Sequence, residues 1–289
     1  MPYDRCSAVV HRDGLVCGER REALNVAASS SGSIHDDAKA AELGYRGGLV
    51  SGLVHNEQFI PLALDLFGPS WFERGGFAFA YRTPTLDGEP VQAFAREPVV
   101  GETQVKAWSQ DGAGDRVADG VLFLGDGAGT PLDTRLAASR LAEGRILRHV
   151  ALGPFGPQRR VRVSAEVQAL MRDTTTEPHP WYFGPSPWGP AVASTRSLYR
   201  LLEPRAVTEA VDPTGVRVDA GIQIRFAAGP PLVETDYLVD CEAVQRSETS
   251  KTEVLWLRSE MREAATGRVV LDQLMEKRWM KSASALYRA

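Results

Sequence analysis

Hydrophobic positions in the first half of the chain follow two different periods. From Ser51 to about Phe67 the sequence begins polar and ends apolar nearly all round, which predicts a helix capped by Ser51 with a buried end. Pro61 should kink this helix or loosen its last turns. Phe77, Phe79 and Tyr81 then stand at every second position, which is the period of a strand. The pattern predicts more strands and a connecting helix over residues 89–97, 102–109, 117–124 and 133–142.

The second half of the chain repeats this order. Residues 191–203 read as a helix after a loop rich in proline and aromatic residues at 177–190. The segments 77–91 and 222–235 resemble each other, since each has a strand, a turn containing proline, an acidic residue and another strand. Strand-like runs lie at 8–27, 145–151, 160–170, 215–227, 232–245, 251–263 and 268–280. We therefore expect an α+β protein with a structural repeat, divided at 1–143 and 144–289.

A histidine stands at the start of the segment that precedes the first buried helix. Ser33 could cap a short helix that begins at Ile34 and has Asp36 at its third position, and Gly44 should end it. Both Asp36 and Asp37 suit the positive end of such a helix. A glycine-rich turn then leads to the helix that Ser51 caps. His35 is thus predicted to lie just ahead of the short helix, which the glycine-rich turn joins to the buried helix.

Three parts of this segment resemble the hydratase motif of MaoC-like (R)-specific enoyl-CoA hydratases and dehydratases: Ser30–His35, Ala41 and Gly44–Gly52. The specific match covers about residues 28–53. The order of strands extends the resemblance over the whole chain as a tandem (double) hotdog, in which each half is a long helix wrapped by an antiparallel sheet. The resemblance implies a lyase that adds water to, or removes it from, an acyl thioester of coenzyme A or a carrier protein. His35 would be the general acid and base, and the backbone N–H of Gly52 would hold the thioester carbonyl.

The sequence departs from that family at one important position. Ser30 stands where the family has its catalytic aspartate, and a hydroxyl can orient a water or a histidine but cannot act as a carboxylate base. Asp36 or Asp37 could replace the missing carboxylate, although both also suit the start of a helix. The second half has no Ile-His-x-Asp sequence, so we expect a single site in the first half, with pocket walls from the second.

Two other functions are compatible with the same fold. A hotdog enzyme without the family's aspartate could catalyse an isomerisation or a cyclisation of a specialised metabolite, using shape and polarisation. A non-catalytic binding or partner protein is the third hypothesis, and it predicts a fully buried His35 with both ring nitrogens bonded to the backbone. The predicted catalytic residues are His35, Ser30, Asp36 and Gly52. The predicted substrate-binding residues are Asp37, Tyr45, Ser51, His55, Trp181 and Trp188.

Composition narrows the possible partners. The chain has 33 Lys and Arg against 37 Asp and Glu, a net charge of −4, and no basic cluster typical of proteins that bind nucleic acid or membranes. Cys6, Cys17 and Cys241 have no paired spacing, so we expect neither a disulfide framework nor a metal site, and no cofactor. The polar N-terminus and the lack of an 18-residue apolar run predict a cytoplasmic protein. Exposed sheet edges would permit a homodimer.

Overall fold

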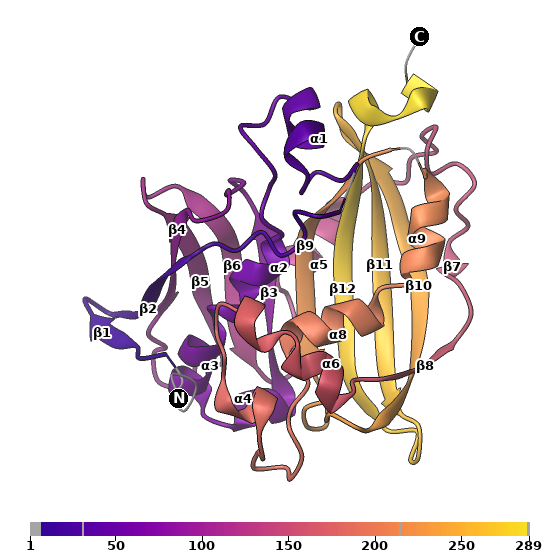
Figure 1. The fold of residues 1–289 in the computed structure, drawn as a ribbon. Coiled ribbons are helices and arrows are strands. Elements are labelled where there is room, and N and C mark those ends of the chain that lie inside the picture. Colours follow the sequence, from indigo (N-terminus) through magenta and orange to yellow (C-terminus); the bar gives the residue numbers. More distant parts are fainter. Residues whose placement is uncertain (1–6, 31, 214, 288–289) are drawn as a thin grey trace.

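The computed structural model describes residues 7–30, 32–213 and 215–287, so that Cys6 lies outside the described residues. Two strands from distant parts of the chain pair at its centre, β3 (Gly75–Tyr81) and β9 (Arg217–Phe226). They run antiparallel, with Phe77 opposite Ile224 and Phe79 opposite Ile222, and all four of these side chains are buried. The two halves of the chain are thus joined into one continuous sheet (Figure 1).

The strands on the two sides of this central pair follow the same chain order. The first half continues from β3 through β6 (Arg116–Leu124), β5 (Gln104–Asp111), β4 (Pro90–Arg96), β2 (Leu15–Glu22) and β1 (Val10–Arg12). The second half continues from β9 through β12 (Val269–Met280), β11 (Thr252–Glu263) and β10 (Asp236–Glu248), with β7 (Gly153–Pro154) and β8 (Arg159–Arg162) both pairing with β10. All of these pairings are antiparallel. The α+β double arrangement predicted from the sequence is confirmed.

Short backbone bridges support the predicted repeat. Leu49, just before the first buried helix, pairs with Leu86 beyond β3, and Val192, just before the second, pairs with Leu232 beyond β9. In each half, the residues just before the helix are therefore hydrogen-bonded to the segment that follows the central strand. The division at 143 and 144 stays a prediction.

The predicted helix over 51–67 is interrupted. It forms α2 (Gly52–Glu57) and α3 (Ile60–Phe67), and Pro61 is the second residue of α3. Because proline lacks an N–H and crowds the preceding turn, the interruption before Pro61 confirms the predicted kink. Phe59 and Leu62 are fully buried, in the same core cluster as Leu198 of α8 (Thr195–Leu202). The helices of both halves thus share one core against the sheet (Figure 1).

Shorter elements differ more from the sequence-based expectations. The helix expected at 133–142 is α5 (Pro131–Ala138), which begins earlier because Thr130 and Asp133 form a capping box. The expected strand at 145–151 is wrong, since these residues form turns and loop, and the run at 160–170 divides into β8 and α6 (Ala165–Ala169). The other short helices are α1 (Asp37–Glu42), α4 (Ser70–Arg74), α7 (Pro180–Phe183) and α9 (Arg205–Val211). Among the residues described, no helix combines the length and apolarity needed to cross a membrane.

Candidate functional site

The short helix α1 is capped by Asp36, one turn later than predicted. The Asp36 carboxylate accepts hydrogen bonds from the backbone N–H groups of Ala38 (2.8 Å) and Lys39 (3.4 Å), and also from that of Gly32 (3.3 Å). These bonds, chiefly the one from Ala38, lower the pKa of Asp36. The expected cap by Ser33 is wrong, because its hydroxyl accepts instead from the backbone N–H of His35, at 3.2 Å. Asp36 therefore has a structural role in helix capping.

The His35 ring is held in one orientation by the backbone. Its Nδ1 lies 2.6 Å from the carbonyl oxygen of Leu49, and because a carbonyl can only accept, Nδ1 carries the proton. Nε2 is consequently the unprotonated nitrogen of the neutral ring. The side chain is partly buried, so it is neither enclosed in the core nor free in solvent.

The loop around His35 depends on a close approach of two backbone segments. A Cβ at Gly48 would lie 2.2 Å from the carbonyl oxygen of His35, so only glycine fits there. Asn25 donates from Nδ2 to the same oxygen (2.9 Å), and Asp37 accepts from the Gly48 N–H (2.7 Å). The second aspartate of the motif is thereby used to fix the glycine turn.

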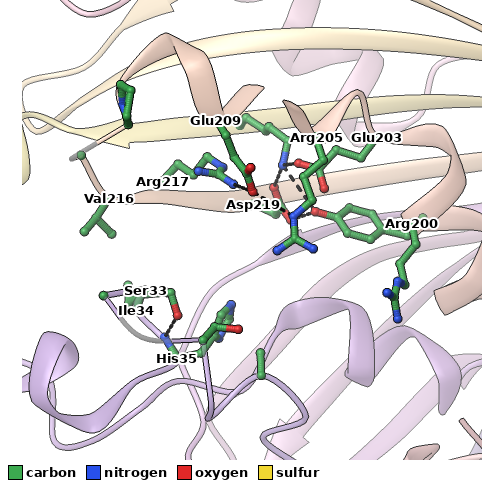
Figure 2. Close-up of a pocket in the computed structure, with 17 residues that line it drawn as sticks. Ser33, Ile34, His35, Arg200, Glu203, Arg205, Glu209, Val216, Arg217 and Asp219 are labelled. Atoms are coloured by element: carbon green, nitrogen blue, oxygen red, sulfur yellow. Dashed lines mark hydrogen bonds and ion pairs between the residues drawn. The ribbon is translucent and has the colours of Figure 1, made fainter. Parts of the chain in front are cut away.

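Two cavities meet at His35. The first has a volume of about 670 Å³ and a lining rich in charged side chains; the second, of about 480 Å³, has a more apolar lining. Ile34, His35 and Asp219 line both of them. Ser30 lines the first cavity, on the same side as His35. Figure 2 shows the charged cavity, with Ser33 and His35 on one side and the charged residues of the second half on the other.

Gly52 begins α2 at the wall of the second cavity. A Cβ there would lie 2.6 Å from three atoms of the Tyr81 ring, which covers the first turn of the helix. Tyr81 is in turn held by Asn56, whose Nδ2 donates to the Tyr81 hydroxyl at 2.8 Å. Burial raises the pKa of Tyr81, so its hydroxyl stays protonated at neutral pH. Glycine at position 52 allows the ring to pack directly on the helix start.

Three of the predicted substrate-binding residues line the second cavity: Tyr45, Ser51 and His55. Ser51 precedes α2 as its N-cap residue, yet its side chain makes no capping hydrogen bond. His55 is only 2% exposed, and its Nε2 lies 2.8 Å from the hydroxyl of Thr85. Burial lowers the pKa of His55 to about 4, so this ring is neutral at physiological pH.

The structure places the other predicted binding residues elsewhere. Asp37 is the first residue of α1, bonds through its side chain to Gly48 of the glycine turn, and lines neither of the two cavities at His35. Trp181 and Trp188 pack on Phe72, with ring centroids 6.1 and 5.9 Å away, and Phe72 packs on Phe226 at 5.4 Å. This aromatic cluster lies at the start of β3 and the end of β9. Tyr81 and Asp219 lie at the opposite end of the same strand pair, so the aromatic rings fill the position related to the His35 site by the two-fold repeat.

Sequence reasoning missed a group of charged side chains on the second half. Lys277 of β12 is buried, and its Nζ lies 2.6 Å from Oδ1 of Asp219 and 2.7 Å from Oε1 of Glu203. The Tyr199 hydroxyl donates to Oδ2 of Asp219 at 2.7 Å. These four residues, which we call the Lys277 cluster, all line the charged cavity with His35 (Figure 2). A sequence signal did exist, because Glu276-Lys277-Arg278 puts three consecutive charged residues near the end of a strand rich in apolar residues.

Electrostatics keep Lys277 and Asp219 ionised. Burial alone would lower the pKa of Lys277, but Asp219 and Glu203 outweigh it and raise the pKa. Burial likewise opposes the charge on Asp219, whereas Lys277, followed by the Tyr199 hydroxyl, lowers its pKa. Asp219 is therefore a carboxylate anion at neutral pH.

No arrangement of ligands for a metal occurs in the part of the chain that the structure describes, since no three His, Cys, Asp or Glu side chains converge there. Cys17 and Cys241 are both buried and free. Burial raises the pKa of the Cys241 thiol, so it is protonated and unreactive at neutral pH.

Comparisons with known proteins show the fold. No family model matches the sequence. No curated protein matches it either. Among solved structures, the chain resembles a putative MaoC domain protein dehydratase from Chloroflexus aurantiacus J-10-fl, with a TM-score of 0.60 and 12% identity, covering 96% of this chain and 95% of that one.

Two further structures agree. A conserved hypothetical protein from Mycobacterium tuberculosis that has a double hotdog fold gives a TM-score of 0.56 at 14% identity, with 95% and 96% of the two chains covered. The dehydratase domain from the CurJ module of curacin polyketide synthase gives 0.52 at 11% identity, with 95% and 96% covered. Together with the mirrored strand order around β3 and β9, these likenesses establish that this chain has the double hotdog fold found in MaoC-like dehydratases.

Proposed function

We propose that this protein is a hydratase or dehydratase that adds water to, or removes it from, the double bond of an acyl thioester. One observation carries the proposal: the proton on Nδ1 of His35 is committed to the Leu49 carbonyl, which leaves Nε2 as a base at the junction of two cavities. Gly52 lines one of the same cavities, so its backbone N–H is the candidate donor to the thioester carbonyl.

The reaction needs one group that transfers a proton in both directions. In hydration, Nε2 of His35 takes a proton from water while the water oxygen bonds to the β-carbon. The electron pair of the double bond moves toward the thioester carbonyl, where the N–H of Gly52 stabilises the negative charge. His35 then returns its proton to the α-carbon, and the reverse sequence releases water.

The two cavities suit a long substrate that passes His35. The charged cavity of about 670 Å³ is lined by Arg200, Arg205 and Arg217, which would attract the phosphate-bearing carrier of a coenzyme A or carrier-protein thioester. The second cavity of about 480 Å³ is more apolar, and we assign it to the acyl group. A non-catalytic protein would predict a fully buried His35 with both ring nitrogens bonded to the backbone. His35 is instead partly exposed, and its ring bonds to the backbone through Nδ1.

A panel of 2-enoyl thioesters of graded chain length, on coenzyme A and on a pantetheine carrier, tests this function. Hydration is followed by loss of the enoyl absorbance and by the mass of one added water. We expect His35→Gln to lower kcat at least about 100-fold, as for loss of a general acid–base group. His11→Gln is the matched control, because His11 is exposed on β1 and bonded to Asp65 and Glu97.

Two results would overturn the proposal. The first is a folded wild-type protein that hydrates none of the thioesters and dehydrates none of the corresponding 3-hydroxyacyl thioesters. The second is hydration that His35→Gln leaves at the level of His11→Gln. A shifted double bond without a change of mass would support the isomerase alternative instead.

A further inference from the structure

Ser30 stands where the resembled family has its catalytic aspartate, so a carboxylate that acts with His35 must come from another part of the chain. Three carboxylates line the charged cavity, Glu203, Glu209 and Asp219, and of these only Asp219 also lines the second cavity within the described residues. Asp219 therefore shares with His35 the junction where the two cavities meet. It belongs to β9, in the second half of the chain.

The other two carboxylates are occupied differently. Glu209 is half exposed on α9 and accepts from Arg205 (2.9 Å) and Arg217 (3.3 Å) at the rim of the cavity. The side chain of Glu203 is 8% exposed, and its Oε1 pairs with Lys277 at 2.7 Å. The Asp219 side chain is 18% exposed, so part of the carboxylate faces the cavity.

We propose that Asp219 is the carboxylate that acts with His35 on the reacting water, so that one site is assembled from both halves of the chain. The inference rests on the hydratase or dehydratase function proposed above. It adds a catalytic residue that the sequence motif does not contain, on a strand that is distant from the motif in the sequence.

The geometry of the Asp219 carboxylate leaves room for a water. A carboxylate offers about four lone-pair positions. Lys277 uses one on Oδ1 and Tyr199 uses one on Oδ2, and these two bonds fix the plane of the group. The remaining positions can accept a hydrogen bond from water in the cavity.

The proposed step balances with the water as the only added reactant. One hydrogen of the water is held by the Asp219 carboxylate and stays on the oxygen. The other passes to Nε2 of His35 as the water oxygen bonds to the β-carbon. The carbon–carbon double-bond electrons move to the thioester, and His35 gives its proton to the α-carbon. In dehydration the same carboxylate holds the departing hydroxyl while His35 protonates it.

Asp219→Asn tests the role of the charge, because the amide keeps the size of the side chain. Asp272→Asn is the matched control: Asp272 lies on β12 opposite Arg225 of β9, bonds to it at 2.5 Å and is 14% exposed. Both variants thus remove one partly buried ion pair from the same two strands. We expect Asp219→Asn to lower kcat about 100-fold or more, and Asp272→Asn to stay within about threefold of wild type. Equal activity of the two variants would overturn the inference.

Asp219→Glu serves if the asparagine variant does not fold. It keeps the charge and the bond to Lys277 but moves the carboxylate by one methylene. Loss of activity of about tenfold or more in this folded variant supports a positioned carboxylate. Full activity shows that the cluster needs only a negative charge and refutes the proposal.

A crystal structure of the wild-type protein provides a test that does not depend on turnover. We expect a water, or the hydroxyl of a bound 3-hydroxyacyl pantetheine, within about 3.2 Å of both His35 Nε2 and an Asp219 oxygen. The absence of any bridging atom in a well-ordered cavity overturns the role of Asp219. Failure of the whole thioester panel, by contrast, overturns the proposed function, so the two failures are distinguishable.

Discussion

Gly52→Ala is the substitution for which the structure gives the clearest physical expectation. The added Cβ would lie 2.6 Å from atoms of the Tyr81 ring, whereas ordinary carbon contacts are about 3.5 to 4.0 Å. The ring or the start of α2 must therefore move by about 1 Å. The Tyr81 ring cannot simply swing away, because its hydroxyl accepts a hydrogen bond from Asn56.

Two free-energy terms of opposite sign determine the effect on stability. Forcing one methyl group into a packed contact costs about 1 to 3 kcal/mol. Alanine gains up to about 1 kcal/mol over glycine within a helix, and less at its first residue. We expect a net destabilisation of about 1 to 2 kcal/mol, from the difference between the two terms. A displacement of about 1 Å at the proposed carbonyl donor should also cost about 100-fold in kcat/KM.

Urea denaturation and thioester kinetics measure the two effects separately, and a double-mutant cycle identifies their cause. In a Tyr81→Ala background the clashing ring is gone, so Gly52→Ala should there be neutral or slightly stabilising. Gly47→Ala is the control within the same loop, because its Cβ would meet Asp37 and Leu86 at ordinary distances of 3.4 to 3.7 Å. Equal destabilisation by Gly52→Ala in both backgrounds would refute the packing argument.

Two further predictions concern the titratable groups. His55 has a native pKa of about 4, against about 6.5 when unfolded, so the unfolded chain binds a proton first as the pH falls; the stability that neutral His55 supports is complete above pH 6.5 and should decrease by about 2 kcal/mol by pH 5. Urea midpoints at pH 7.5 and 5 should therefore differ less for His55→Gln than for wild type, and an identical difference would contradict the assignment. Lys277→Met leaves Asp219 and Glu203 without their shared cation and should cost about 3 to 5 kcal/mol at pH 7.5. The cost should shrink at pH 5, because burial raises the pKa of Asp219 once Lys277 is gone and the carboxylate gains a proton, and the double variant with Asp219→Asn should recover part of it.

The strands and the repeat could be predicted because they depend on local pattern. Large side chains at every second position, as at Phe77 and Phe79, indicate a strand whatever packs against it. The interruption of the first buried helix also follows from a single residue, Pro61. The cap of α1 was misassigned by one turn because Ser33 and Asp36 are both good caps, and only the path of the loop determines which one meets the helix N–H groups.

The charged half of the site could not be predicted in the same way. Lys277, Asp219 and Tyr199 come from two strands and a helix, and no spacing in the sequence brings them together with His35. The three consecutive charged residues Glu276, Lys277 and Arg278 in a strand with many apolar residues indicate that buried charge is present, yet not which cavity it faces. Their partners emerge only when β9 and β12 pair, because the register then sets Lys277 opposite Asp219.

The two-fold repeat allows the two halves to contribute differently to the single site that we propose. A repeat produces two related positions at opposite ends of the β3–β9 pair, and a shared core requires at least one of them to be filled. Phe72, Trp181 and Phe226 fill the end near the second helix, which stabilises the sheet without requiring polar groups there. The other end keeps His35 from the first half and gains Asp219 from the second. Under our proposal, the second half supplies across the cavity the carboxylate that Ser30 cannot provide.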